Sequence, residues 1–155
     1  MHIPIKVDYG VRALVELGLS ASEEPMRAVD IARRTNIPEQ FLAQVLLTLA
    51  RAGMVKSQRG PNGGHILAMD PDDIKLSMIM AQLGAGDTLV GCLDDIGSCV
   101  QYRSCAQRDI WASVADAVFQ ILDSTTVGEL VRRTRATEAA NLDKGREQAV
   151  EISVA

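Results

Sequence analysis

All three cysteines of this 155-residue chain lie in one short segment, at Cys92, Cys99 and Cys105. Thiolates are soft ligands that suit iron–sulfur clusters and zinc, and both kinds of centre need about four donors. Zinc sites usually pair cysteines across two to four intervening residues, whereas the gaps here are six and five. The spacing favours an iron–sulfur cluster over zinc, because a larger iron–sulfur core suits a wider loop. Of the two common cluster types we expect [4Fe-4S] rather than [2Fe-2S], although the spacing does not determine which. Zinc and thiol-only redox chemistry remain alternatives.

Three cysteines leave one coordination position to be filled by another group. The chain has only two histidines, His2 near its start and His65 in a glycine-rich stretch. The carboxylates nearest the cysteines in sequence are Asp94, Asp95 and Asp109. These three are candidate ligands by proximity alone.

The composition predicts a mainly helical protein of the cytoplasm. The hydrophobic share is 47% but the aromatic share only 3%, and the apolar residues recur at helical intervals. No uninterrupted apolar run approaches the roughly 18 residues that span a bilayer, so we expect no membrane partner. In a reducing cytoplasm an odd number of clustered cysteines indicates metal binding or redox chemistry more than disulfides.

Charge is distributed unevenly along the chain, although its net value is −4. Residues 1–68 carry eight Lys/Arg against six Asp/Glu, and residues 69–155 carry eight against fourteen. Between Glu39 and Asp70 there is no acidic residue, while Arg51, Lys56 and Arg59 lie there. A local basic surface of this kind suits contact with phosphate.

Periodicity predicts helices over residues 5–18 and 27–34 and a third from Pro38 to Gly53. The third has an apolar inner stripe and a short, polar outer face that can enter a groove. The inner stripe is Phe41, Leu42, Val45, Leu46 and Leu49, and the outer face is Glu39, Gln40, Ala43, Gln44, Thr48 and Arg51.

Two short β-like runs, 54–58 and 65–68, flank a turn that contains Asn62-Gly63. Asn-Gly between such runs is a strong hairpin signal. Helices followed by a hairpin predict a winged helix-turn-helix domain over residues 1–69, with its third helix in the major groove of DNA. A winged helix used only for protein contact is the alternative. The expected DNA-binding residues are Pro38, Glu39, Gln40, Phe41, Gln44, Arg51, Lys56, Arg59 and Gly60.

The second half of the chain divides into a connecting helix and loop (70–90), a cysteine loop (91–106) and a dimerisation helix with a short final helix (106–131). The helix over about 106–122 carries one apolar stripe, made of Ile110, Trp111, Val114, Val118, Ile121 and Leu122. Thr126 and Glu129 are spaced as a capping box for the final helix. Residues 136–155 have little apolar periodicity, which predicts a mobile tail.

The stretches "IPEQFLAQVLLTLARAGMV" and "RGPNGGHILA", with three cysteines followed by "RDIW", resemble the Rrf-two family of bacterial winged-helix regulators. The resemblance covers residues 1 to about 131, and His65 stands where that family usually has tyrosine. It implies a homodimer on a double-stranded DNA operator, with the three cysteines holding an iron–sulfur cluster.

The resemblance also bears on the fourth ligand. IscR-type members have a histidine three residues after the third cysteine, where this chain has Arg108, which cannot ligate. NsrR-type members instead have an acidic residue in a pattern similar to "IKVDYGVRAL", and it reaches the cluster from the partner subunit. Here that residue is Asp8. A solvated helix carboxylate is the alternative interpretation of Asp8.

Together these patterns predict a cluster-sensing, sequence-specific transcription regulator, a repressor that responds to iron, redox state or nitric oxide. The alternative is an iron–sulfur carrier or electron-transfer module that uses the winged helix for protein contacts. No catalytic Cys/His or Ser/His/Asp pattern, phosphate loop or dinucleotide fingerprint occurs, so we do not expect an enzyme.

Overall fold

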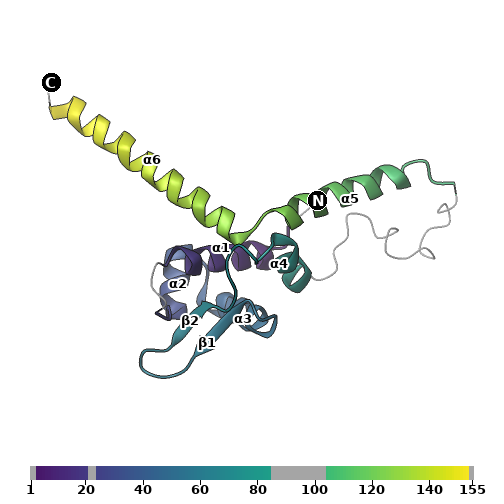
Figure 1. Ribbon diagram of the computed structural model, residues 1–155, viewed down its shortest axis with the longest axis horizontal. Helices are drawn as coiled ribbons and strands as arrows, with labels where there is room; N and C mark the ends of the chain where they lie inside the picture. The colour runs from purple at the N-terminus through teal and green to yellow at the C-terminus, as the bar shows by residue number, and fades with distance from the viewer. Residues whose placement is uncertain (1–2, 21–23, 85–103, 154–155) are drawn as a thin grey trace.

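The computed structural model describes residues 3–20, 24–84 and 104–153 (Figure 1). The described chain is mainly helical with one two-stranded antiparallel sheet, which confirms the predicted fold class. Its elements are α1 (Ile5–Leu19), α2 (Ala28–Thr35), α3 (Glu39–Arg51), β1 (Val55–Gln58), β2 (Gly64–Leu67), α4 (Leu76–Leu83), α5 (Arg108–Ser124) and α6 (Val127–Ser153). No helix among these described residues is long and apolar enough to cross a membrane.

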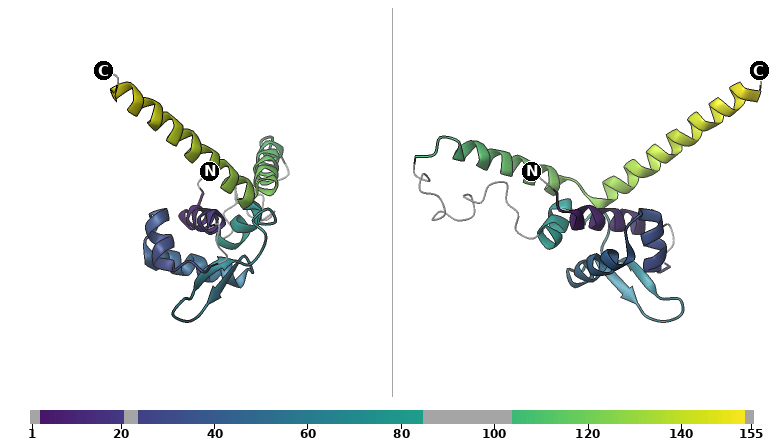
Figure 2. Two further views of the ribbon diagram at one scale, coloured as in Figure 1. Left: turned by 60° about the vertical axis from the view of Figure 1, so that its left-hand side comes forward. Right: turned by 180° about the vertical axis from the view of Figure 1, so that it is seen from behind.

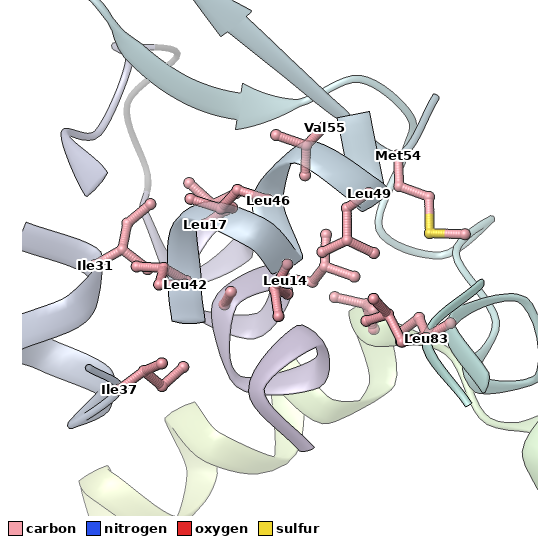
Figure 3. Close-up of a cluster of buried hydrophobic side chains, with 14 of the residues drawn as sticks. Leu14, Leu17, Ile31, Ile37, Leu42, Leu46, Leu49, Met54, Val55 and Leu83 are labelled. Atoms are coloured by element: carbon pink, nitrogen blue, oxygen red, sulfur yellow. The ribbon is translucent and has the colours of Figure 1, made fainter. Parts of the chain in front are cut away.

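One hydrophobic core holds α1 to α4 together, and the first turns of α6 contribute to it (Figure 3). Leu14 of α1, Ile31 of α2 and Leu42 of α3 are all 0% exposed. On α3 the buried positions are Leu42, Val45, Leu46 and Leu49, which share one face because residues three and four apart lie together on a helix. The opposite face of α3 therefore points away from the core.

The connection between α2 and α3 is short and locally determined. Asn36 ends α2 in the left-handed conformation (φ 54°), which asparagine tolerates better than most residues. The next residue, Ile37, is 3% exposed and its N–H donates to the Ala32 carbonyl at 3.1 Å. The Pro38 carbonyl then accepts from the N–H groups of Phe41 and Leu42, both at 3.0 Å, and starts α3. This is the tight turn of a helix-turn-helix.

The predicted hairpin is confirmed, with Val55 paired to Leu67 at its base and Gln58 to Gly64 at its tip. The turn between the strands contains Gly60 at φ 118°, a backbone conformation that glycine adopts without steric cost. Figure 1 shows the hairpin projecting as a wing beside α3. Hairpin and α3 thus lie on one side of the domain, as the winged helix-turn-helix prediction requires.

Helices α5 and α6 leave the domain in different directions from a common point next to α4 (Figures 1 and 2). None of the residues of α5 is buried. The apolar stripe predicted for this helix is divided in the structure. Val118 and Leu122 are half-buried, whereas Ile110, Trp111, Val114 and Ile121 are 62%, 39%, 38% and 65% exposed.

The prediction for the C-terminal residues was wrong in one respect. Instead of a short helix ending near residue 131 and a tail from 136, α6 runs without interruption from Val127 to Ser153. The predicted cap is partly confirmed, because the Glu129 N–H donates to Thr126 Oγ1 at 3.1 Å. Residues 136–153 are rich in alanine and glutamate, which favour helix even without an apolar stripe.

Candidate nucleic-acid interface and cluster segment

The outward face of α3 presents polar side chains on a rigid support. Glu39, Gln40, Gln44 and Arg51 are all exposed, while the opposite face of the same helix is buried in the core. Amide and guanidinium groups are the side chains that most often pair with base edges in the major groove. The predicted recognition residues on α3 therefore share one accessible surface.

Phe41 differs from its expected place in the inner stripe, because its side chain is 45% exposed. It lies in the first turn of α3, where the next residue, Leu42, is the one that is buried. Leu47, on the outward face, is 54% exposed. An apolar side chain beside polar ones in this position can contact the methyl group of thymine, so exposure makes Phe41 a better candidate for DNA contact.

The wing supplies positive charge next to this face. Lys56 on β1 and Arg59 in the turn are both exposed. Gly60 and Gly63 close the turn through a hydrogen bond from the Gly63 N–H to the Gly60 carbonyl at 2.9 Å. This turn places an arginine at the tip of a hairpin, where it can reach a phosphate or a narrow groove.

Two residues that hold the wing were missed from the sequence. Met26, just before α2, exchanges backbone hydrogen bonds with His65 at 3.0 and 2.8 Å, and Arg27 Nη2 donates to the Pro61 carbonyl at 3.0 Å. These contacts fasten the hairpin to the segment that leads into the helix-turn-helix. A separation of 34 residues leaves no local pattern by which the Arg27 contact could have been found.

His65 is a structural residue of the wing in the described chain. Its Nδ1 lies 3.1 Å from Ser57 Oγ on the facing strand. Burial lowers the pKa of His65 below its ordinary value of 6.5, because the charged form loses solvation. His65 is therefore neutral at physiological pH.

Of the three predicted cysteine ligands, the structure describes only Cys105. Its thiol is half-buried and in no disulfide, and it precedes α5 by three residues, with the Arg108 N–H donating to its carbonyl at 3.4 Å. Cys92 and Cys99 lie outside the described residues, as do Asp94 and Asp95. Within residues 3–20, 24–84 and 104–153 no three potential metal donors come together.

Asp8, the predicted fourth ligand, is on α1 and pairs with Arg12 at 2.7 Å. Its side chain is 38% exposed, so it is accessible from outside its own subunit. The N-terminal end of α5 is the end that points away from the domain and from α1 (Figures 1 and 2). Within one chain, α1, which carries Asp8, is therefore apart from the end of α5 that follows Cys105 (Figures 1 and 2). Asp109, the other described candidate, is 90% exposed beside Arg108.

Comparisons with known proteins agree with this geometry. Residues 3–133 match the Rrf2 family, described as iron-dependent transcriptional regulators. The chain is 34% identical to the HTH-type transcriptional regulator CymR of Bacillus subtilis over 140 residues, which is 90% of this chain and 96% of that protein. The solved structure of that CymR, "the Global Cysteine Regulator of B. subtilis", superposes with a TM-score of 0.72 over 86% of this chain and 98% of the other. The structure of T. potens IscR has a TM-score of 0.70 at 29% identity, covering 86% and 88% of the two chains.

Proposed function

The chain belongs to the Rrf2 family of transcription regulators, and from that premise we propose that it is a dimeric, DNA-binding repressor controlled by an iron–sulfur cluster. Relatives in this family are regulators and not enzymes. We expect it to act in the cytoplasm, where DNA is present and thiols stay reduced.

DNA recognition is supported above all by the exposed polar face of α3 next to the basic wing. In a winged helix-turn-helix the second helix of the motif enters the major groove, and here that helix is α3. Gln40 and Gln44 can pair with adenine, and Glu39 can accept from the amino group of cytosine. Arg51, Lys56 and Arg59 then contact phosphate or the minor groove, and Pro38, Phe41 and Gly60 shape the contact surface.

The apolar stripe left exposed on α5 supports a homodimer. Ile110, Val114, Ala117 and Ile121 follow one another at intervals of four, three and four residues, the spacing at which two helices interlock side chains. All four side chains are more than a third exposed. A second copy of the same helix, related by a twofold axis, buries such a stripe on both sides.

The proposal of a cluster is supported by the presence of three cysteines close together in the sequence, of which the structure describes one. Cys105 is an unpaired, partly accessible soft donor at the end of the dimerisation helix, and Cys92 and Cys99 precede it in the sequence. In a dimer, Asp8 of the partner subunit is a candidate fourth ligand and would have to exchange Arg12 for iron. A bound [4Fe-4S] cluster would supply the sensitivity to iron, redox state or nitric oxide, because a carboxylate ligand is held more weakly by such centres than thiolate.

Anaerobic purification tests this proposal. The wild type should be brown and contain iron and sulfide, and Cys92→Ala, Cys99→Ala or Cys105→Ala should each abolish the cluster. Ser98→Ala, a small change next to Cys99 in the sequence, is the matched control. Zinc at one equivalent with no iron would exclude the cluster.

Two other functions make different predictions. A cysteine-responsive regulator, a role that the name "Global Cysteine Regulator" gives to CymR of B. subtilis, would bind an operator without any iron. An iron–sulfur carrier would hold a cluster but show no salt-sensitive binding to duplex DNA.

A further inference from the structure

The point at which α5 and α6 diverge is fastened to the segment that leads from the wing into α4 (Figure 1). We call this contact the joint, and define it as residues 71–77 together with residues 123–132. It is the place where the direction of α5 relative to the DNA-binding domain is determined.

Backbone hydrogen bonds tie the two halves of the joint together. The Leu76 N–H donates to the Thr125 carbonyl at 3.0 Å, the Val127 N–H to Ile74 at 2.9 Å and the Gly128 N–H to Pro71 at 2.8 Å. Ile74 and Val127 are both 0% exposed. The base of the joint is thus part of the domain core.

Gly128 packs closely against Asp72, so a larger residue at this position would require the Asp72 side chain to move. A Cβ atom added at Gly128 would collide with Oδ1 of Asp72. The close approach brings the first turn of α6 directly against the Asp72 carboxylate.

Two carboxylates clamp the outside of the joint, one on each side of the divergence. Arg132 Nη1 of α6 lies 2.8 and 3.0 Å from the two oxygens of Asp72. At the end of α5, Asp123 accepts from Lys75 Nζ at 2.9 Å and from Ser77 Oγ at 2.8 Å. One clamp therefore fixes α6, and the other fixes α5.

The side chains of both clamps lie at the surface and are only partly buried. The side chains of Asp72 and Arg132 are 56% and 61% exposed, and those of Lys75 and Asp123 are 45% and 39% exposed. Exposed ion pairs add little to stability, but they can restrict the angle at which two elements meet. Because one clamp holds α5 and the other holds α6 at the same joint, they are well placed to restrict the angle between these helices and the domain.

A small change of angle at the joint has a large effect at the other end of α5. The 17 residues of α5 make a rod of about 25 Å, so a tilt of about 10° moves its far end by about 4 Å. That displacement is close to the rise of one base pair, about 3.4 Å. In a dimer formed through α5, the tilt would change the distance between the two copies of α3.

We infer that the Asp72–Arg132 and Asp123–Lys75–Ser77 clamps are positioning contacts that set the half-site spacing of the operator. The inference rests on the proposed dimeric DNA-binding function and deepens it. The residues on α3 and the wing read each half-site, whereas the joint determines how far apart two half-sites must be.

The experiment uses duplexes with two half-sites separated by a series of spacings, taken from sequences that the wild type selects out of a random library. The full-length wild type should prefer one spacing over its neighbours by at least about fivefold, the lower end of ordinary coupling between sites. The double variant Asp72→Asn/Asp123→Asn should lose most of that preference. Its affinity for a duplex with a single half-site should equal that of the wild type.

Matched control variants distinguish the effect of opening the joint from the effect of simply removing a surface charge. Asp73→Asn removes an adjacent exposed carboxylate whose side chain has no partner in the described part of the chain. As a second and milder variant, Arg132→Gln opens one clamp, and Arg133→Gln is its control because Arg133 pairs with Glu129 of its own helix. Spacing preference should fall in Arg132→Gln and stay unchanged in both controls. Circular dichroism melts check that each variant is folded.

The results distinguish a failure of the inference about the joint from a failure of the proposed DNA-binding function. If the wild type has a preferred spacing and folded Arg132→Gln and double variants keep it, the joint has no positioning role. A wild type that binds no duplex would overturn the proposed function, and this inference with it.

Discussion

The winged helix-turn-helix domain buries its apolar residues in a core, whereas helix α5 leaves most of its large apolar side chains exposed. Every residue of the described core cluster comes from the N-terminal 83 residues or from the first turns of α6, and none comes from α5. On α5 the side chains of Ile110, Phe119 and Ile121 are 60% exposed or more. The domain is complete as one chain, whereas α5 carries an apolar surface that a second copy would complete.

The largest effect should come from the core of the domain. Leu46→Ala removes a side chain that is 1% exposed and should lower the free energy of unfolding by about 2–5 kcal/mol, because the core cannot close over the cavity. Urea denaturation followed by circular dichroism measures this. Leu47→Ala, at the neighbouring position that is 54% exposed, is the control and should change the free energy by less than about 1 kcal/mol. Equal effects would mean that the inner and outer faces of α3 are wrongly assigned.

The second prediction concerns association instead of folding. An isoleucine buried at an interface contributes about 1.5–3 kcal/mol, and a twofold axis buries Ile121 twice. Ile121→Glu should therefore weaken the dimer by at least about 100-fold while each subunit remains folded. Sedimentation equilibrium gives the dissociation constant. Gln120→Glu adds the same charge at an exposed polar neighbour and should leave the dimer intact; a dimer unaffected by Ile121→Glu would place the interface elsewhere.

The third prediction tests the wing. Arg59→Ala should weaken operator binding by roughly 1–3 kcal/mol and reduce the slope of affinity against salt, while cluster and dimer persist. Gln40→Ala and Gln44→Ala should alter base preference with an unchanged salt slope. Arg133→Ala, on α6 and away from the wing, is the control for lost charge. An Arg59→Ala protein with unchanged affinity and salt dependence would show that the wing does not touch DNA.

The smallest effect should be a dependence of stability on pH that comes from His65. Its folded pKa lies below 6.5 because of burial, so the unfolded chain binds the proton more readily. The contribution of neutral His65 to the free energy of unfolding should then be complete above pH 6.5. It should decrease as the pH falls below that value and level off below the pKa of His65 in the folded protein. Urea midpoints at about pH 7.5 and about pH 5.5 measure this component. His65→Gln should lack it and His2→Gln should keep it; the opposite result would contradict the assignment to His65.

Local patterns predicted most of the domain because its elements depend on neighbouring residues. The turn at Asn36 and Pro38, the buried stripe from Leu42 to Leu49 and the hairpin around Asn62-Gly63 all follow from spacing and backbone preference. The length of α6 does not follow from apolar periodicity, because its later turns have no apolar stripe and are favoured instead by the helix propensity of alanine and glutamate.

Contacts between distant segments were not predictable in this way. The Arg27 contact with Pro61 and the Asp72 contact with Arg132 join residues 34 and 60 positions apart, and neither has a motif. The full ligand set of the cluster stays a prediction, because Cys92 and Cys99 lie outside the described residues.

The most direct test of regulation by a cluster is the operator affinity of the anaerobically purified protein before and after its iron is removed by a chelator. If the cluster controls DNA binding, the two affinities should differ by about 5–150-fold, the usual range of coupling between two sites. Cys105→Ala should give the iron-free value in both preparations. Equal affinities for a preparation with full iron and sulfide content and for its iron-free counterpart would contradict regulation by a cluster.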